Sequence, residues 1–149
     1  MKPSNYKSLH IIKQVSATNG ATLTSDQVDT KDHNYCVIAV YATTSDAATN
    51  NPSTLKVQES DTTAATDFAD ITAFVGDGTG GFTVPSSPTA TTTAPFAKFC
   101  LNLTKRKRYL RVLVTPLTTQ TFSIVADLHQ SDSVPVGTTD ENVACVVRG

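Results

Sequence analysis

The most constraining feature of this sequence is the spacing of its apolar residues, which recur at every second position in short runs. Alternation of this kind covers segments 54–58, 97–103, 110–114 and 122–128. A period of two places alternate side chains on opposite faces of an extended chain, so each run predicts a β-strand with one buried face. No segment of ten or more residues repeats its apolar positions at the period of a helix. The pattern therefore predicts an all-β protein.

The composition agrees with an all-β protein and argues against nucleic acid or an anionic membrane as the binding partner. Threonine accounts for 25 of the 149 residues, and β-branched side chains favour strands and loops over helices. A helical bundle or coiled coil is thereby excluded. Charged residues make up 17% of the chain and nearly balance, with a formal net charge of -1. A chain without a strong field is a poor candidate for binding nucleic acid or an anionic membrane.

Turn signals divide the chain into eight or nine short strands. The best-defined central strand is Tyr35–Ala42, an eight-residue run that is apolar on both faces. Segments 97–103, 109–115 and 122–128 predict two successive hairpins, a β-meander with turns at 105–108 and 116–120. The other expected strands are 8–17, 21–30 (short or only extended), 54–60 and 68–75. This set predicts an antiparallel β-sandwich or jelly-roll-like domain with extended terminal arms.

We expect a single domain over residues 1–149. Residues 1–8 would form an N-terminal arm, 9–128 the β-sandwich core, and 129–149 a C-terminal arm or an added strand. The stretch 85–95, rich in Pro and Thr, predicts a long exposed loop. The N-terminal residues do not match a signal peptide, and the longest apolar run is far too short to cross a bilayer. We therefore expect synthesis in a cytoplasm and no membrane span.

Residues with catalytic or ligand-binding chemistry are scattered. His10, His33 and His129 have no second His or Cys at zinc-ligand spacing. Cys36 and Cys100 lie in apolar runs and are expected to be buried, reduced thiols. The glycine-rich segment 76–81 resembles a fragment of a calcium-binding repeat, but it occurs once and is better explained as a turn. We expect no metal, no cofactor and no enzymatic activity.

The one local concentration of charge is the basic run Lys105, Arg106, Lys107 and Arg108. Four cations could contact a phosphate backbone or an acidic protein surface. A solvated turn is the simpler interpretation, since Tyr109 is the only aromatic residue beside them and the chain as a whole is slightly acidic. The run is a possible protein-contact site.

Several phrases of the sequence resemble a broad group of small head proteins of tailed bacteriophages. They begin with residues 28–30 before the strand Tyr35–Ala42. The phrases KVQESD (56–61), ADI (69–71) and RKRYLRV (106–112) then recur in this order and at similar separations. The resemblance covers roughly residues 25–130. The chain departs from the pattern at both ends and in the enlarged 85–95 loop.

The resemblance implies a capsid decoration, or cement, protein. Such a protein attaches to the outer surface of the virion head and ties neighbouring major capsid proteins together. The implied partner is the major capsid protein, and the implied assembly is a homotrimer near local three-fold axes or, failing that, a dimer at two-fold axes. Two alternatives stay open: a carbohydrate-binding adhesion sandwich, and a low-copy head-completion or tail component. The first usually needs aromatic platforms, and this chain has no Trp and only 4 Tyr.

Overall fold

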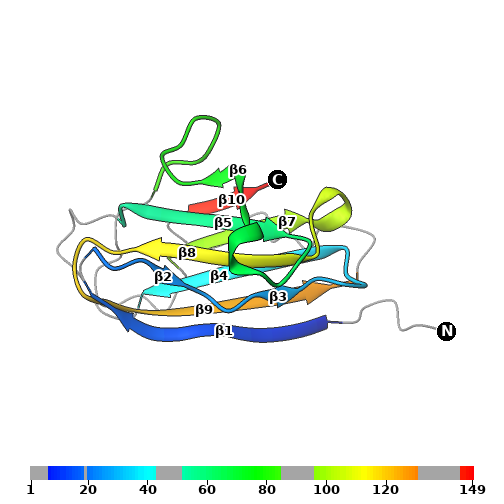
Figure 1. Cartoon of the computed structure of the whole chain (residues 1–149), viewed down its shortest axis with the longest axis horizontal. Coiled ribbons are helices and arrows are strands. Elements are labelled where there is room, and N and C mark those ends of the chain that lie inside the picture. The colour runs from blue at the N-terminus through cyan, green and yellow to red at the C-terminus, as the bar shows by residue number, and fades with distance from the viewer. Residues whose placement is uncertain (1–6, 19, 43–51, 85–95, 131–144) are drawn as a thin grey trace.

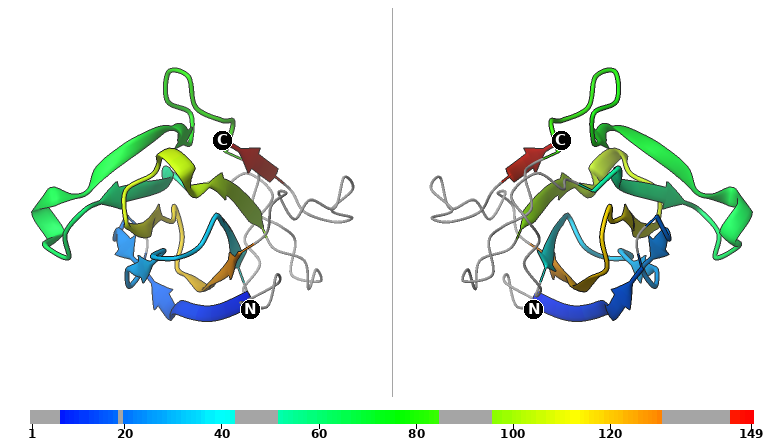
Figure 2. Two further views of the ribbon diagram at one scale, coloured as in Figure 1. Left: turned by 90° about the vertical axis from the view of Figure 1, so that its right-hand side faces the viewer. Right: turned by 90° about the vertical axis from the view of Figure 1, so that its left-hand side faces the viewer.

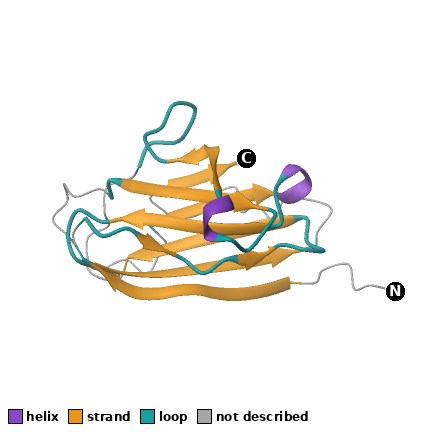
Figure 3. Cartoon of the chain, in the orientation of Figure 1, coloured by secondary structure: helices purple, strands orange, loops and turns teal. Residues whose placement is uncertain are grey.

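The structure is a computed structural model that describes residues 7–18, 20–42, 52–84, 96–130 and 145–149. These residues form ten strands and two three-residue 3-10 helices (Figure 3). The strands are β1 (Lys7–Ala17), β2 (Leu23–Thr24), β3 (Val28–Asp29), β4 (Tyr35–Ala42), β5 (Thr54–Ser60), β6 (Ala69–Val75), β7 (Ala97–Asn102), β8 (Tyr109–Thr115), β9 (Gln120–His129) and β10 (Cys145–Arg148). The 3-10 helices are η1 (Ala65–Asp67) and η2 (Leu103–Lys105). Neither is long enough to cross a membrane, and the described residues contain no longer helix.

The strands form two sheets that pack face to face, as Figures 1 and 2 show. Sheet A has the order β1-β9-β4-β7-β10, and sheet B has the order β2-β8-β5-β6, with β3 also pairing with β8. All pairs of these strands are antiparallel except β10 with β7, which is parallel. The predicted all-β sandwich is confirmed.

The connections between strands are those of a jelly roll. The chain passes from β4 in sheet A to β5 and β6 in sheet B, returns to sheet A at β7, crosses to β8, and returns again at β9. The predicted β-meander is therefore wrong, because β7 and β8 lie in different sheets. The crossing is made by η2, where buried Leu103 anchors the turn and its N–H donates to the carbonyl of Asn34. Alternation identifies the buried face of a strand but does not identify its neighbour.

The core lies between the sheets and is lined by alternate residues of each strand. In β4, Cys36, Ile38 and Val40 are fully buried, whereas Val37 and Ala39 on the other face are partly exposed. The strand is central, between β9 and β7, as predicted, and only one of its two apolar faces is buried. Only one face of each sheet meets the other sheet of a sandwich.

Aromatic side chains join the two layers at one end of the core. Phe99 of β7 makes edge-to-face contacts with Phe74 of β6 and Phe82, at ring-centroid distances of 6.0 and 5.5 Å. Phe82 follows the glycine-rich turn, in which a Cβ at Gly81 would lie 1.8 Å from the carbonyl oxygen of Val75. The predicted turn over 76–81 is thus confirmed. Among the described residues, no cluster of His, Cys, Asp and Glu could hold a metal ion.

The two ends of the chain differ from the predicted boundaries. β1 begins at Lys7 and pairs with β9 from there, so the strand includes residues 7 and 8 that were assigned to an arm. β9 continues to His129, one residue past the predicted end of the core. β10 adds to sheet A beside β7, which is the added strand that was one of two options for the C-terminus. Residues 1–6, 131–144 and the predicted 85–95 loop lie outside the described residues.

Candidate functional site

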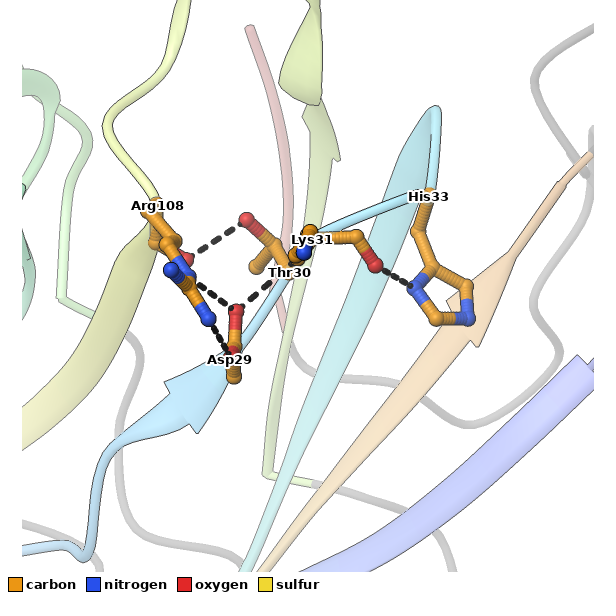
Figure 4. A network of polar contacts seen from close by, with 5 residues as sticks. All are labelled: Asp29, Thr30, Lys31, His33 and Arg108. Atoms are coloured by element: carbon orange, nitrogen blue, oxygen red, sulfur yellow. Dashed lines mark hydrogen bonds and ion pairs between the residues drawn. The ribbon is translucent and has the colours of Figure 1, made fainter.

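The basic turn, Lys105–Arg108, is held to the sandwich by two acidic residues from other strands. The first is Asp29 of β3, which receives two hydrogen bonds from the Arg108 guanidinium, at 2.9 Å from Nε and 2.6 Å from Nη2 (Figure 4). The Thr30 hydroxyl donates to the carbonyl of Arg108 at 2.7 Å, and the Lys31 N–H donates to Asp29. The hydrogen bonds from Arg108 lower the pKa of Asp29, and they raise that of Arg108. Both groups are therefore charged at neutral pH.

The second acid is Glu59 of β5. Its carboxylate lies 3.6 Å from Arg106 Nη1 and accepts a hydrogen bond of 3.1 Å from the backbone N–H of Lys107. Its side chain is only 15% exposed, so this contact is better shielded from water than the Asp29 pair. Asp29 therefore holds the end of the turn at Arg108, and Glu59 holds its middle at Arg106 and the backbone of Lys107.

These pairings divide the predicted contact residues into two kinds. Arg106 and Arg108 are occupied by acids of the same chain, and Arg108 also lies over the ring of Tyr109 at 5.0 Å. Among the described residues, no carboxylate forms an ion pair with the ammonium groups of Lys105 or Lys107. The two lysines are therefore the members of the turn that can attract an acidic partner.

A second polar cluster covers the outer face of sheet B. We call it the outer network; it consists of Lys56, Gln58, Phe68, Asp70 and Arg111. Asp70 accepts hydrogen bonds from Lys56 Nζ at 2.9 Å and from Gln58 Nε2 at 2.7 Å. Arg111 Nε donates to Gln58 Oε1 at 2.8 Å, and its guanidinium stacks on the Phe68 ring at 4.1 Å. The network links β5, β6 and β8 across the sheet.

Burial would raise the pKa of Asp70, but the hydrogen bonds from Gln58 and Lys56 outweigh it and lower that pKa below its usual value. The carboxylate is therefore charged at neutral pH. Beside Arg111 is a shallow groove of about 300 Å³, lined by Ser25, Asp26, Gln27, Thr63, Ala65 and Arg111. The Phe68 ring carries the guanidinium on its face, so that face is not available for stacking by a sugar.

The phrases that carry the resemblance to phage head proteins meet in these two clusters. Asp29 belongs to the first phrase, Glu59 to KVQESD, and Asp70 to ADI, while Arg108 and Arg111 belong to RKRYLRV. Arg108 and Asp29 are 79 positions apart in sequence, and Lys107 and Glu59 are 48 apart. Sequence reasoning identified the cations but missed these acidic partners, because no local spacing links them.

The edge strand β1 carries exposed apolar side chains, a feature that sequence analysis did not single out. Leu9 is 65% exposed, Ile11 69% and Val15 40%. Leu9 and Ile11 lie opposite Asp127 and Val125 of β9, on the outer face of sheet A. Val15 follows the bulge and lies opposite buried Phe122, on the other face of the sheet. Single exposed apolar residues are ordinary on protein surfaces, but two neighbouring ones on an edge strand form a candidate interaction surface.

The residues considered for other chemistry have structural roles. Cys36 and Cys100 are buried free thiols, as predicted. Burial raises the pKa of the Cys36 thiol, so it stays protonated and is a poor nucleophile. His129 Nε2 lies 3.2 Å from Asp127 Oδ2 on β9, and His33 donates from Nδ1 to the carbonyl of Lys31. Asp77, in the glycine-rich turn, accepts a hydrogen bond from the Val84 N–H.

Comparison with known proteins adds no assignment. No protein-family model matches the chain, and no curated protein sequence matches it significantly.

Proposed function

We propose that this protein is a structural virion component, a decoration protein that binds the outside of a tailed-phage head. In this role it stabilises contacts between neighbouring major capsid proteins. The observation that carries the proposal is the meeting of the resemblance phrases in the basic turn and the outer network. These phrases are distant in sequence, but their residues pair in the fold, Asp29 with Arg108 and Glu59 with Arg106, so they form one connected part of the surface.

The architecture supports this role on physical grounds. A protein that reinforces a shell needs a rigid body and a surface for attachment. The jelly roll supplies the rigid body through two packed sheets and a core of fully buried Phe, Leu, Ile and Val side chains. The β1 edge and the lysines of the basic turn supply candidate attachment surfaces. Many copies on a symmetric lattice gain avidity, so each contact can be modest.

The test is co-sedimentation with empty heads assembled without this protein. We expect the full chain to pellet with the heads, saturably, and to raise the temperature at which they disrupt. A protein that remains in the supernatant over a wide concentration range contradicts the proposal. A matched chain lacking residues 1–6 measures whether the N-terminal residues are needed for attachment.

Two other assignments give different outcomes in the same preparation. The first alternative, a low-copy head-completion or tail component, would bind only at one vertex of the particle. For the decoration protein itself we propose a homotrimer, or a dimer as the alternative, in the head-bound form. A carbohydrate-binding sandwich would bind a glycan array and leave the heads unoccupied.

A further inference from the structure

We propose that the outer face of sheet A, which is turned away from sheet B, is covered by residues 131–144 of the same chain. This segment connects β9 to β10, and we call it the crossover segment. The inference concerns the free protein and does not rest on the proposed function. It narrows the surface that is open to a partner, because only the β1 side of this face would stay uncovered.

The directions of the strands require the chain to return along sheet A between β9 and β10. β9 is antiparallel to β4, β4 is antiparallel to β7, and β10 is parallel to β7. β9 and β10 therefore run in the same direction, so the chain must pass from His129 back to Cys145 at the opposite end of the sheet. The inner face is filled by the core between the two sheets. The return path then crosses the outer face or passes around an edge.

The usual handedness of such connections selects the outer face. Connections between parallel strands of one sheet are right-handed in about 98% of cases. In Figure 1, β10 lies above β9, both arrows point to the right, and sheet B lies nearer the viewer. A right-handed connection from β9 to β10 then passes behind sheet A, over its outer face.

The crossover segment is long enough for this path. The register places Cys145 in the same row as Ile124 of β9, five positions before His129. The sheet order places β10 three strands away from β9. These offsets correspond to a diagonal of roughly 20–25 Å across the sheet. The 14 residues of the segment reach about 45 Å when extended, which leaves enough chain to pass over the side chains of the face.

The exposure of the outer face differs between its middle and its β1 side. Phe99 and Leu101 of β7 face the core, so Cys100 between them points to the outer face. Cys100 is nevertheless only 5% exposed. Leu9 and Ile11 of β1 lie on the same outer face and are well exposed. A cover over the middle strands that stops short of β1 accounts for both observations.

The composition of the crossover segment complements this face. The segment contains the apolar run Val134, Pro135 and Val136, three acidic residues (Asp132, Asp140 and Glu141), and no Lys, Arg or His. The middle of the face presents Val37 and Ala39 of β4, which are partly exposed. Toward β10 it presents the cations Lys98 and Arg148, which lie opposite Ala39 and Cys100 in the register. The apolar run would cover β4 and β7, and the acids would lie near the cations.

The first test measures how fast a maleimide labels each cysteine of the free, full-length protein, with mass spectrometry to identify the labelled site. It compares the wild type with the double variant Val134→Ser/Val136→Ser. Ile11→Ser is the matched control, because it also removes an apolar side chain from this face but at the β1 edge. Cys36 is fully buried in the core, so its labelling reports whether a variant stays folded.

We expect Cys100 to be labelled slowly in the wild type and at least about tenfold faster in the double variant, because two apolar side chains no longer hold the cover in place. The labelling of Cys36 should stay slow in every variant, and Ile11→Ser should resemble the wild type at Cys100. Rapid labelling of Cys100 in the wild type, or an unchanged rate in the double variant, overturns the inference.

The second test traces the path of the crossover segment. Single cysteines placed at positions 134 to 138 are treated with a short bis-maleimide, and crosslinks to Cys100 are mapped. We expect at least one position to give a crosslink within one chain, whereas Thr24→Cys, exposed on sheet B, should give none. Crosslinks formed only between chains would show that β10 is exchanged between copies. No crosslink from any position would show a path around the edge, and either result overturns the inference.

Discussion

Asp70 illustrates how individual side chains stabilise the outer face of sheet B. Two residues of the neighbouring strand, Lys56 and Gln58, donate to its two carboxylate oxygens. Gln58 is only 8% exposed and also accepts a hydrogen bond from Arg111, so the amide joins a carboxylate to a guanidinium. Replacing any one of Asp70, Gln58 and Arg111 should therefore weaken the hydrogen bonding of the other two.

The substitution Asp70→Asn should reduce the pH dependence of stability. The pKa of Asp70 is lower in the folded protein than its ordinary value of 3.8. Its contribution is therefore present above that value and is lost as the pH falls through the lower folded pKa. We expect the variant to be less stable at pH 7 by under about 1 kcal/mol, since the pair is partly exposed.

Urea unfolding of both proteins between about pH 2 and 7 measures this effect. The difference in unfolding free energy should shrink toward the acid end of the range, where the wild-type carboxylate becomes protonated. A difference that stays constant over the whole range would contradict the assigned role of the charge.

At the scale of elements, the strands were predictable and their partners were not. The unbroken apolar run gave the bounds of Tyr35–Ala42, and alternation gave those of Thr54–Ser60, as the structure has them. It gave no information on which sheet a strand joins. Strands β7, β8 and β9 look like a meander in sequence, but the turn at Leu103 and the loop after Pro116 carry the chain between sheets.

For the candidate site too, the sequence shows the residues of one segment but not the partners that they contact. The basic turn is visible as a run of four cations, but its acidic partners lie in β3 and β5. The exposure of Leu9 and Ile11 could not be predicted, because apolar residues in a strand are ordinarily expected to face the core. Their exposure follows from the position of β1 at the edge of sheet A, which is a property of the topology.

The link between β2 and β3 gives a test at this scale. Ser25, between these short strands, is 5% exposed; its backbone N–H donates to the carbonyl of Val112, and its hydroxyl oxygen accepts from the Val112 N–H at 2.9 Å. The side chain thus continues the ladder with β8 where the two strands are interrupted. Ser25→Ala leaves a buried N–H without its partner, which costs about 1–3 kcal/mol.

Thermal or urea unfolding measures that loss, with Thr24→Ala as the control because Thr24 is exposed. We expect Thr24→Ala to be close to the wild type. Equal stability of the Ser25→Ala variant and the wild type would show that the hydroxyl does not complete the ladder.

At the scale of the whole molecule, the exteriors of the two sheets differ. The outside of sheet B carries a hydrogen-bonded polar network, whereas the outer face of sheet A exposes Leu9 and Ile11 of its edge strand β1. We therefore expect sheet B to face solvent in the assembled particle and the β1 edge to face the shell. The proposed attachment needs no large charge, which agrees with the balanced composition of the chain.

The most direct test of the proposed function is the amount of this protein in purified virions relative to the major capsid protein. Quantitative gel or mass-spectrometric measurement of intact particles gives this ratio. A decoration protein should be present at a copy number of the same order as the major capsid protein. Absence from the particle, or a copy number that fits a single vertex, would contradict the account.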